Sequence, residues 1–253
     1  MKFRSELAAL LAGALIATLA SRAAAEPSQP AAAPTNRSVP LKPYTARYQV
    51  GYKALSGGQI EAQLRRGDRP GSWVYETQAF PNMIGRLAVS PEAREHSTME
   101  ITPAGVRPLA YEFYDGSQDV AQDVRLRFDW SRLSVQGNAD GKDFEMDVPA
   151  GTQDTASVQA AMIVALASGR QPSGYTILTG AKLREYRYWS EGSATLNTAL
   201  GKLDTVVWAS QRDGSTRVGK VWYAPSLGYV PVQAIQYRKG KQLVQMRIVS
   251  LER

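Results

Sequence analysis

The sequence predicts a mainly β fold, in which an antiparallel meander curls into an open barrel or half-barrel around one central α-helix. Stretches of alternating apolar and polar residues recur at the roughly 8 to 12 residue spacing that is typical of all-β sandwiches and barrels. Glycine-containing turns separate these stretches, and a single apolar segment with helical periodicity lies between two strand-rich halves. With 253 residues, the chain is long enough for one sizeable domain.

The N-terminus has the pattern of a cleavable signal peptide. Lys2 and Arg4 precede an apolar run from Leu7 to Ala20, and three alanines precede Glu26. We therefore expect residues 1–25 to be removed on export to the periplasm, which leaves a mature chain with no transmembrane span. The apolar run is shorter than the ~20 residues that cross a bilayer, so a retained anchor is the weaker alternative.

A tether and the first strands follow. Residues 26–43 are rich in proline and alanine and have no period, which predicts a flexible segment ahead of a single β-rich domain at 44–253. Strict alternation begins at Tyr44, where every second residue up to Tyr52 is apolar. Seven further strands of this kind are expected before the helix.

The segment Pro81–Pro91 breaks the alternation. Met83, Ile84 and Leu87 are apolar in a stretch bounded by proline and glycine. The segment is either a loop tucked under the sheet or an exposed apolar flap at the mouth of a cavity or at a membrane or protein contact. Its exposure distinguishes these alternatives.

One helix is expected at about residues 154–168. Its apolar residues lie on all sides, which predicts a buried helix that fills the curl of the sheet. A side-chain oxygen of Thr152 or Asp154 can bond the free backbone N–H groups at its start. Gly169 can end it in the left-handed conformation.

After the helix, about seven more strands bring the expected total to about fifteen. Turns at Leu200-Gly201, Asp213-Gly214 and Lys239-Gly240 separate several of them. Curling the sheet around the helix would cover the helix and reduce the exposed sheet edges. Two separate sheets with the helix between them are the alternative arrangement.

Composition excludes several kinds of chemistry. The chain has no cysteine and only one histidine, His96, so disulfides, thiol catalysis and zinc sites are not expected. We predict no metal, no cofactor and no catalytic residue. The net charge of +7 is scattered along the chain, and no nucleic-acid partner is expected. Paired carboxylates could still hydrolyse a glycan, and the candidates lie on expected strands: Glu76, Glu112, Asp123 and Glu185.

Aromatic residues recur at alternating positions of the expected strands. Such rows are usually part of the core, but some could line a cavity in which tyrosine and tryptophan hold an acyl chain or stack on sugar rings. The candidate ligand-binding residues combine these aromatics with the apolar segment and the helix: Trp73, Tyr75, Met83, Ile84, Leu87, Tyr111, Phe113 and Met162.

Several segments in order resemble a known family. These are P-Y-T-A-R-Y-Q-V-G-Y at the first strand, D-V-P-A-G-T-Q-D before the helix, then L-N-T-A-L-G-K-L-D-T-V, and finally W-Y-A-P-S-L-G-Y-V-P-V. Together they resemble the bacterial family called domain of unknown function 3108, over roughly Pro43 to Leu251. The resemblance implies an exported, mostly β protein of Gram-negative bacteria, and it supplies no catalytic residues.

The leading hypothesis is a non-enzymatic periplasmic envelope protein that binds an apolar or amphipathic ligand, such as a lipid or lipid-linked glycan, in the curled sheet. A protein–protein interaction module in envelope assembly is the first alternative, and its partner would be an envelope protein. An envelope glycan hydrolase is the second.

Overall fold

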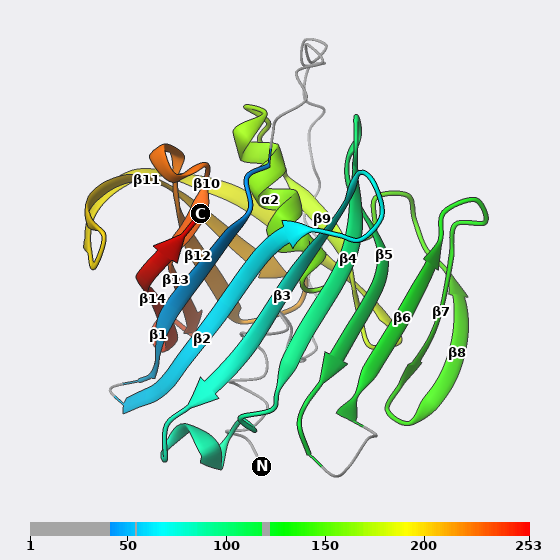
Figure 1. Ribbon diagram of the computed structural model, residues 1–253, viewed down its shortest axis with the longest axis horizontal. Coiled ribbons are helices and arrows are strands. Elements are labelled where there is room, and N and C mark those ends of the chain that lie inside the picture. The colour runs from blue at the N-terminus through cyan, green and yellow to red at the C-terminus, as the bar shows by residue number, and fades with distance from the viewer. Residues whose placement is uncertain (1–40, 54, 118–121) are drawn as a thin grey trace.

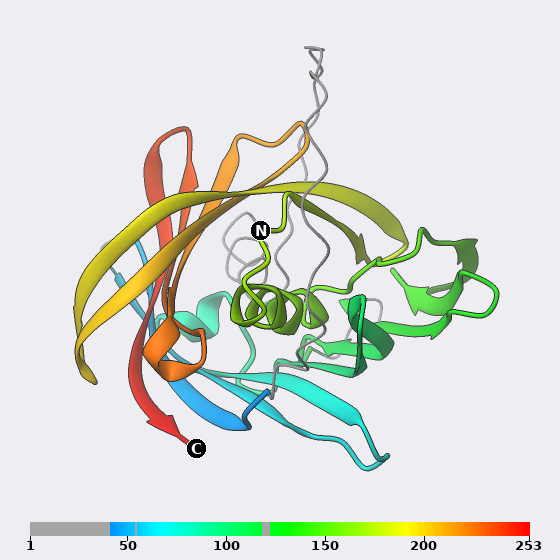
Figure 2. The same ribbon diagram turned by 90° about the horizontal axis from the view of Figure 1, so that it is seen from above.

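The computed structural model describes residues 41–53, 55–117 and 122–253, whose strands form one curled sheet (Figure 1). Fourteen antiparallel strands wrap around one α-helix without closing into a barrel, as the view from above shows (Figure 2). The predicted mainly β fold, with an open curled meander around a central helix, is confirmed. Both the expected signal peptide and most of the expected tether lie outside the described residues.

The sheet consists of two meanders joined by the first and last strands. The first half contains β1 (Tyr44–Tyr52), β2 (Leu55–Arg66), β3 (Ser72–Pro81), β4 (Arg94–Thr102), β5 (Gly105–Tyr114), β6 (Val124–Asp129), β7 (Ser134–Ala139) and β8 (Lys142–Asp147). The second contains β9 (Gly174–Thr179), β10 (Lys182–Thr198), β11 (Gly201–Arg212), β12 (Arg217–Ala224), β13 (Val230–Arg238) and β14 (Lys241–Glu252). Strand β1 pairs with β14, so β8 and β9 are the two edges of the sheet.

The strand count differs from the expected fifteen because β10 is one long strand of 17 residues. The sequence pattern predicts one strand over Lys182–Ser190 and a separate strand that begins at Ala194. The register between β10 and β11 shifts there, between Ser190 and Ser193, and Gly192 has a φ of +88°. A glycine bulge of this kind inserts extra residues without ending the strand. Six strands therefore follow the helix rather than seven.

Helix α2 (Ser157–Ala167) lies inside the curl (Figure 2). Every residue from Ser157 to Leu166 is buried except the half-buried Gln159. Asp154 Oδ1 accepts hydrogen bonds from the backbone N–H groups of Ala156 (2.9 Å) and Ser157 (2.6 Å), so Asp154 bonds free N–H groups before the helix as predicted, although the N-cap position itself is Ala156. Gly169 ends the helix with a φ of +69°, also as predicted.

The segment before the helix pairs with the edge strand β9 at one residue, Gln153. Gln153 N donates to Thr176 O (2.9 Å), and Leu178 N donates to Gln153 O (2.8 Å). The Gln153 side chain donates in turn to Val106 O of β5 (3.0 Å). The buried Gln153 thus connects β9, the edge strand of the second half, to β5 of the first half.

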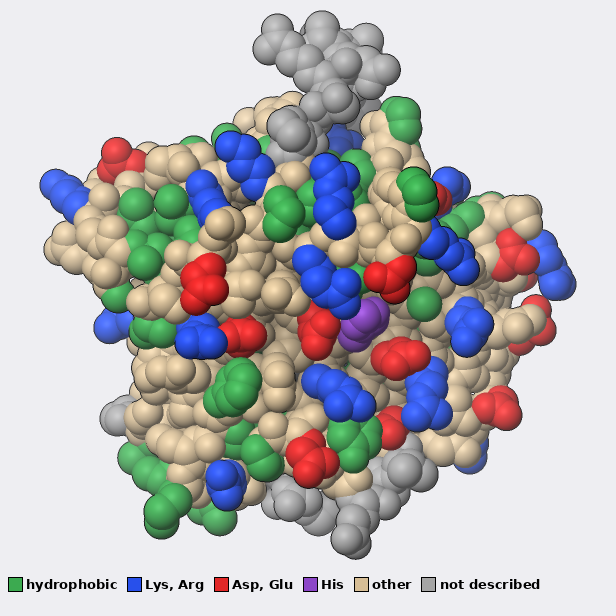
Figure 3. All heavy atoms as spheres, in the orientation of Figure 1, with side chains coloured by type: hydrophobic (Ala, Val, Ile, Leu, Met, Phe, Trp, Pro, Cys, Tyr) green, Lys and Arg blue, Asp and Glu red, His purple; other side chains and the backbone are tan. Residues whose placement is uncertain are grey.

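The outer face of the first half carries interspersed charges around the single histidine (Figure 3). Glu76, His96 and Glu112 are cross-strand neighbours on β3, β4 and β5. His96 Nδ1 lies 3.7 Å from Glu76 Oε2, and its Nε2 lies 3.2 Å from Thr98 Oγ1. No helix within the described ranges is long and apolar enough to cross a membrane.

The Pro81–Pro91 segment lies at one end of the sheet and contains the 3-10 helix η1 (Gly85–Leu87). The side chains of Met83 and Leu87 are 88% and 73% exposed, whereas Gly85 is buried. The segment is therefore exposed rather than tucked under the sheet.

Candidate functional site

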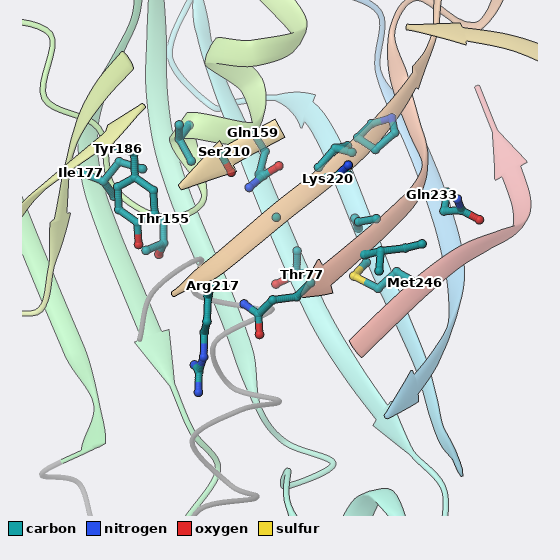
Figure 4. Close-up of a pocket in the computed structure, with 18 of the residues that line it drawn as sticks. Thr77, Thr155, Gln159, Ile177, Tyr186, Ser210, Arg217, Lys220, Gln233 and Met246 are labelled. Carbon is teal, nitrogen blue, oxygen red and sulfur yellow. The ribbon is translucent and has the colours of Figure 1, made fainter. Parts of the chain in front are cut away.

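A partly open cavity of about 170 Å³ lies between the inner face of the sheet and the start of α2 (Figure 4). Strands of both halves contribute to its wall, because the pairing of β1 with β14 places the two meanders side by side. The helix contributes Val158 and Gln159, and the preceding turn contributes Thr155. The cavity therefore exists only when sheet, turn and helix are assembled together.

Most of the wall is apolar or aromatic. Alternation directs every second strand residue inward, and among these residues are Tyr48, Tyr75, Tyr186 and Tyr188. Their rings present apolar faces while each hydroxyl remains a hydrogen-bonding group; Tyr48 OH, for example, donates to Pro231 O (2.9 Å). Such a wall suits the apolar part of a ligand that also has polar groups.

A buried carboxyl group, Glu95 on β4, forms part of the wall. Its side chain accepts hydrogen bonds from Tyr111 OH (2.9 Å) and from Thr155 Oγ1. Burial raises the pKa of Glu95 to about 8, and the nearby charge of Asp154 adds to this, although the hydroxyl hydrogen bonds oppose it. At neutral pH this carboxyl group is therefore mainly protonated.

Asp154 is buried close to Glu95 but has a structural role. Its Oδ2 accepts a hydrogen bond from Ser97 Oγ (2.7 Å), and its Oδ1 caps α2. Burial raises the pKa of Asp154 to about 6, although the hydrogen bonds to Ser157, Ser97 and Ala156 favour the ionised form. Both oxygens of Asp154 are thus engaged in hydrogen bonds that hold the start of the helix against β4.

Basic residues surround the part of the cavity formed by the β11–β12 hairpin. Arg212 is the last residue of β11, Arg217 is the first residue of β12, and Lys220 lies further along β12. Figure 4 shows Arg217 at one end of the cavity and Lys220 with Met246 toward the other. Lys220 Nζ forms an ion pair with Glu191 and lies 5.7 Å from the centre of the Tyr237 ring.

The eight predicted ligand-binding residues separate into three locations. Tyr75 lines the cavity. Trp73, Tyr111, Phe113 and Met162 belong to the main core or pack against it, and Tyr111 reaches the cavity region through its bond to Glu95. Met83, Ile84 and Leu87 lie on the exposed loop. The structure thus does not bring the eight together in one site.

The carboxylates considered for glycan hydrolysis do not line the cavity. Glu76, Glu112 and Glu185 lie on strands and are half-buried or exposed, and Asp123 Oδ1 accepts a hydrogen bond from Asp115 N (3.3 Å). In the part of the chain that the structure describes, no three histidine or acidic side chains are grouped so that they could hold a metal ion.

Sequence reasoning missed Glu95, Arg212 and Arg217. Glu95 has the same strand parity as Met99, whose side chain is fully buried, so the alternation of β4 contained the signal. The two arginines flank a predicted turn, where nothing in the local sequence shows which face is inward.

These features define a class of protein in which an open antiparallel sheet curls around a buried helix and leaves a tyrosine-lined cavity between them. The family model described as "Protein of unknown function (DUF3108)" matches residues 44–241. The chain belongs to this family, as the sequence resemblance indicated.

Solved structures with low sequence identity are also similar. A proposed exported protein with a YmcC-like fold from Bacteroides fragilis has 10% identity and a TM-score of 0.36, with 83% of this chain and 95% of that chain covered. A proposed lipoprotein from Parabacteroides distasonis has 10% identity and a TM-score of 0.32, with 84% and 96% covered. The hypothetical lipoprotein YmcC from Escherichia coli has 11% identity and a TM-score of 0.30, with 83% and 85% covered. No curated protein matches the chain.

Proposed function

We propose that this protein is a non-enzymatic protein of the periplasm that binds the apolar part of an amphipathic envelope component, such as a lipid or a lipid-linked glycan. The observation that carries the proposal is the tyrosine-lined cavity between the sheet and α2. The signal-peptide pattern of residues 1–25 supports the location.

The size of the cavity limits what it can hold. Small-molecule sites usually enclose roughly 300–1,000 Å³, whereas this cavity is about 170 Å³ and partly open. It therefore suits one apolar chain or ring of a larger molecule, with the remainder outside the curl.

Native mass spectrometry of the protein purified from its own cells tests this proposal. We expect a bound mass that solvent extraction releases as a lipid or glycolipid. Ala234 lines the cavity on β13, so Ala234→Trp should fill the cavity and abolish the bound mass. Ala110→Trp is the matched control because Ala110 is half-buried on β5 and does not line the cavity. Recovery of the wild-type protein without any ligand would overturn the proposal.

The exposed loop favours a second candidate function, an interaction module that holds an envelope protein. Of the six exposed large apolar side chains among the described residues, five lie at the Pro81–Pro91 end: Leu55, Phe80, Met83, Ile84 and Leu87. The pairing of Gly58 with Pro81 places Leu55 and Phe80 close to this loop. Apolar groups gathered in this way are typical of contact surfaces.

Site-specific photocrosslinking in cells tests this second candidate. A crosslinker at Met83 or Leu87 should capture one defined protein, whereas a crosslinker at Leu133 should not. Leu133 is the sixth exposed apolar side chain and lies between β6 and β7, which makes it a suitable control. Equal background from all three positions counts against an interaction module.

A further inference from the structure

Arg212 is a buried cation in the cavity wall. Its side chain extends from the last residue of β11, and the residue is only 6% exposed. Its Nε is buried and has no hydrogen-bond partner among the described residues. Within the same part of the chain, no carboxylate lies within ion-pair distance of its guanidinium.

The neighbouring charges do not compensate this cation. Burial lowers the pKa of Arg212, and the positive charge of Arg184 on β10 lowers it further, whereas Tyr186 opposes this shift. Asp213, the next residue, forms its ion pair with Arg187 instead (3.2 Å). The other arginine, lysine and carboxyl side chains of the cavity wall are Arg217, Lys220, which is paired with Glu191, and Glu95, whose raised pKa of about 8 leaves it mainly uncharged at neutral pH.

A guanidinium whose Nε is buried without an acceptor is unfavourable, because this N–H group has lost its hydration without gaining a hydrogen bond or an ion pair. An anionic group of a ligand would supply the missing counter-charge and hydrogen-bond acceptor. Arginine is well suited to this role, since its planar guanidinium can donate two parallel hydrogen bonds to a carboxylate or a phosphate. The apolar wall adjoining Arg212 would then face the remainder of the same ligand.

We propose that Arg212, together with Arg217, binds the anionic head group of an amphiphile whose apolar chain occupies the cavity. This inference rests on the proposed ligand-binding function and restricts it to one ligand class. A carboxylate and a phosphate ester can both accept hydrogen bonds from the two guanidinium groups, and the titration described next distinguishes between them.

Calorimetric titration of the full chain compares three probes with the same C12 chain: dodecanoate, dodecyl phosphate and dodecan-1-ol. We expect at least one anionic probe to bind about tenfold tighter than the alcohol, as a charge-assisted hydrogen bond in a buried site allows. The tighter of the two anions identifies the head-group chemistry. Equal affinity for all three probes would overturn the anion site and leave the cavity function intact, whereas no binding of any probe would overturn both.

A variant separates a binding role from a structural one. Arg212→Met removes the guanidinium and its charge but keeps an apolar chain about as long as the arginine stem. We expect this variant to bind the anions and the alcohol with similar affinity, because only the anions lose a charged partner, and the melting temperature of the free protein should be equal or higher. Arg184→Gln removes a nearby positive charge that does not line the cavity, and it should retain most of the preference.

The melting temperature of Arg212→Met distinguishes a binding role of Arg212 from a purely structural one. If Arg212→Met lowers the melting temperature and weakens the alcohol and the anions equally, Arg212 is a structural residue and the proposal is wrong. The comparison of the three probes on the wild-type chain needs no variant, so poor folding of Arg212→Met would not remove the test.

Discussion

Glu95 shows how one residue can link the cavity to the stability of the fold. Its carboxyl group lines the cavity and is hydrogen-bonded to Tyr111 on the adjacent strand and to Thr155 before the helix. The same side chain therefore connects two strands with the helix entry. Protonation of this group changes the stability of all three elements together.

The stability of the protein should fall as the pH rises through the neutral range. The native state holds the Glu95 proton up to a pKa of about 8, compared with 4.5 for an ordinary glutamate. The native state therefore binds more protons than the unfolded chain, so this stabilisation is complete below about pH 4.5 and is lost by about pH 8. Urea unfolding at pH 6.5 and pH 8 should show a decline of up to about 1.4 kcal/mol per pH unit.

The variant Glu95→Gln should flatten this decline, because its amide does not titrate. Asp154 has the same direction of effect, but its pKa of about 6 confines it to lower pH. Glu112→Gln, at an exposed position on the neighbouring strand, should keep the wild-type slope. An unchanged slope in Glu95→Gln would show that the carboxyl group is ionised in the native state.

The sequence predicted the structural roles of some individual residues but not of others. Asp154 and Gly169 were recognised from the chemistry of helix ends, which is local. The burial of Glu95 was readable from strand parity, since Met99 shares its face. Arg212 could not be recognised, because its position depends on cross-strand neighbours and on the curl of the sheet rather than on adjacent residues.

Individual strands and the helix were largely predictable because alternation and helical periodicity are properties of short segments. The boundary after Ser190 was wrong because Gly192 forms a bulge that continues β10. A glycine in a strand has the same sequence signature whether it marks a bulge or a turn.

The Pro81–Pro91 loop is positioned by close packing at one glycine. Gly85 N donates to Asn82 Oδ1 (2.9 Å), and a Cβ atom added at Gly85 would lie only 1.9 Å from Gly57 O. The β1–β2 end of the sheet therefore touches the loop through backbone atoms, and its apolar side chains project from a fixed base.

Gly85→Ala should lower the free energy of unfolding by about 1–3 kcal/mol, the usual effect of overpacking. Met83→Ser in the same loop should change it by less than about 0.5 kcal/mol, because Met83 is 88% exposed. Urea unfolding monitored by circular dichroism measures both. Equal stability of Gly85→Ala and the wild type would mean that the loop can move away from Gly57 without penalty.

The order of strands within the whole molecule is the feature that the sequence could not supply. Hairpin partners follow from short turns, but the pairing of β1 with β14 joins residues about two hundred positions apart. No local pattern encodes such a pairing. Because the cavity is lined from both halves, the sequence could suggest a cavity in the curled sheet but could not identify most of the residues that line it.

A substitution at Val244 tests whether the two halves of the sheet unfold together. It is fully buried in β14 and pairs with Tyr52 of β1 and Gln236 of β13. Val244→Asp should lower the stability by about 4 kcal/mol, because it buries a charge in the strand that joins the halves. Hydrogen exchange should then show loss of protection in both β3 and β12. Gln245→Asp, at the adjacent half-buried position, should have a small effect.

Loss of protection restricted to β13 and β14 would contradict this expectation. It would show that the first half is stable without its partner.

The position of β14 also determines when β1 can complete its pairing during synthesis of the chain. During synthesis, the strands β1 to β8 become available long before the last strand, and β1 has an unpaired backbone edge until residues 241–252 exist. An unpaired edge of this length can pair with other chains. The protein therefore depends on residues 241–252 for protection of this edge against aggregation, and a chain that stops at Gly240 would expose both β1 and β13 to such pairing.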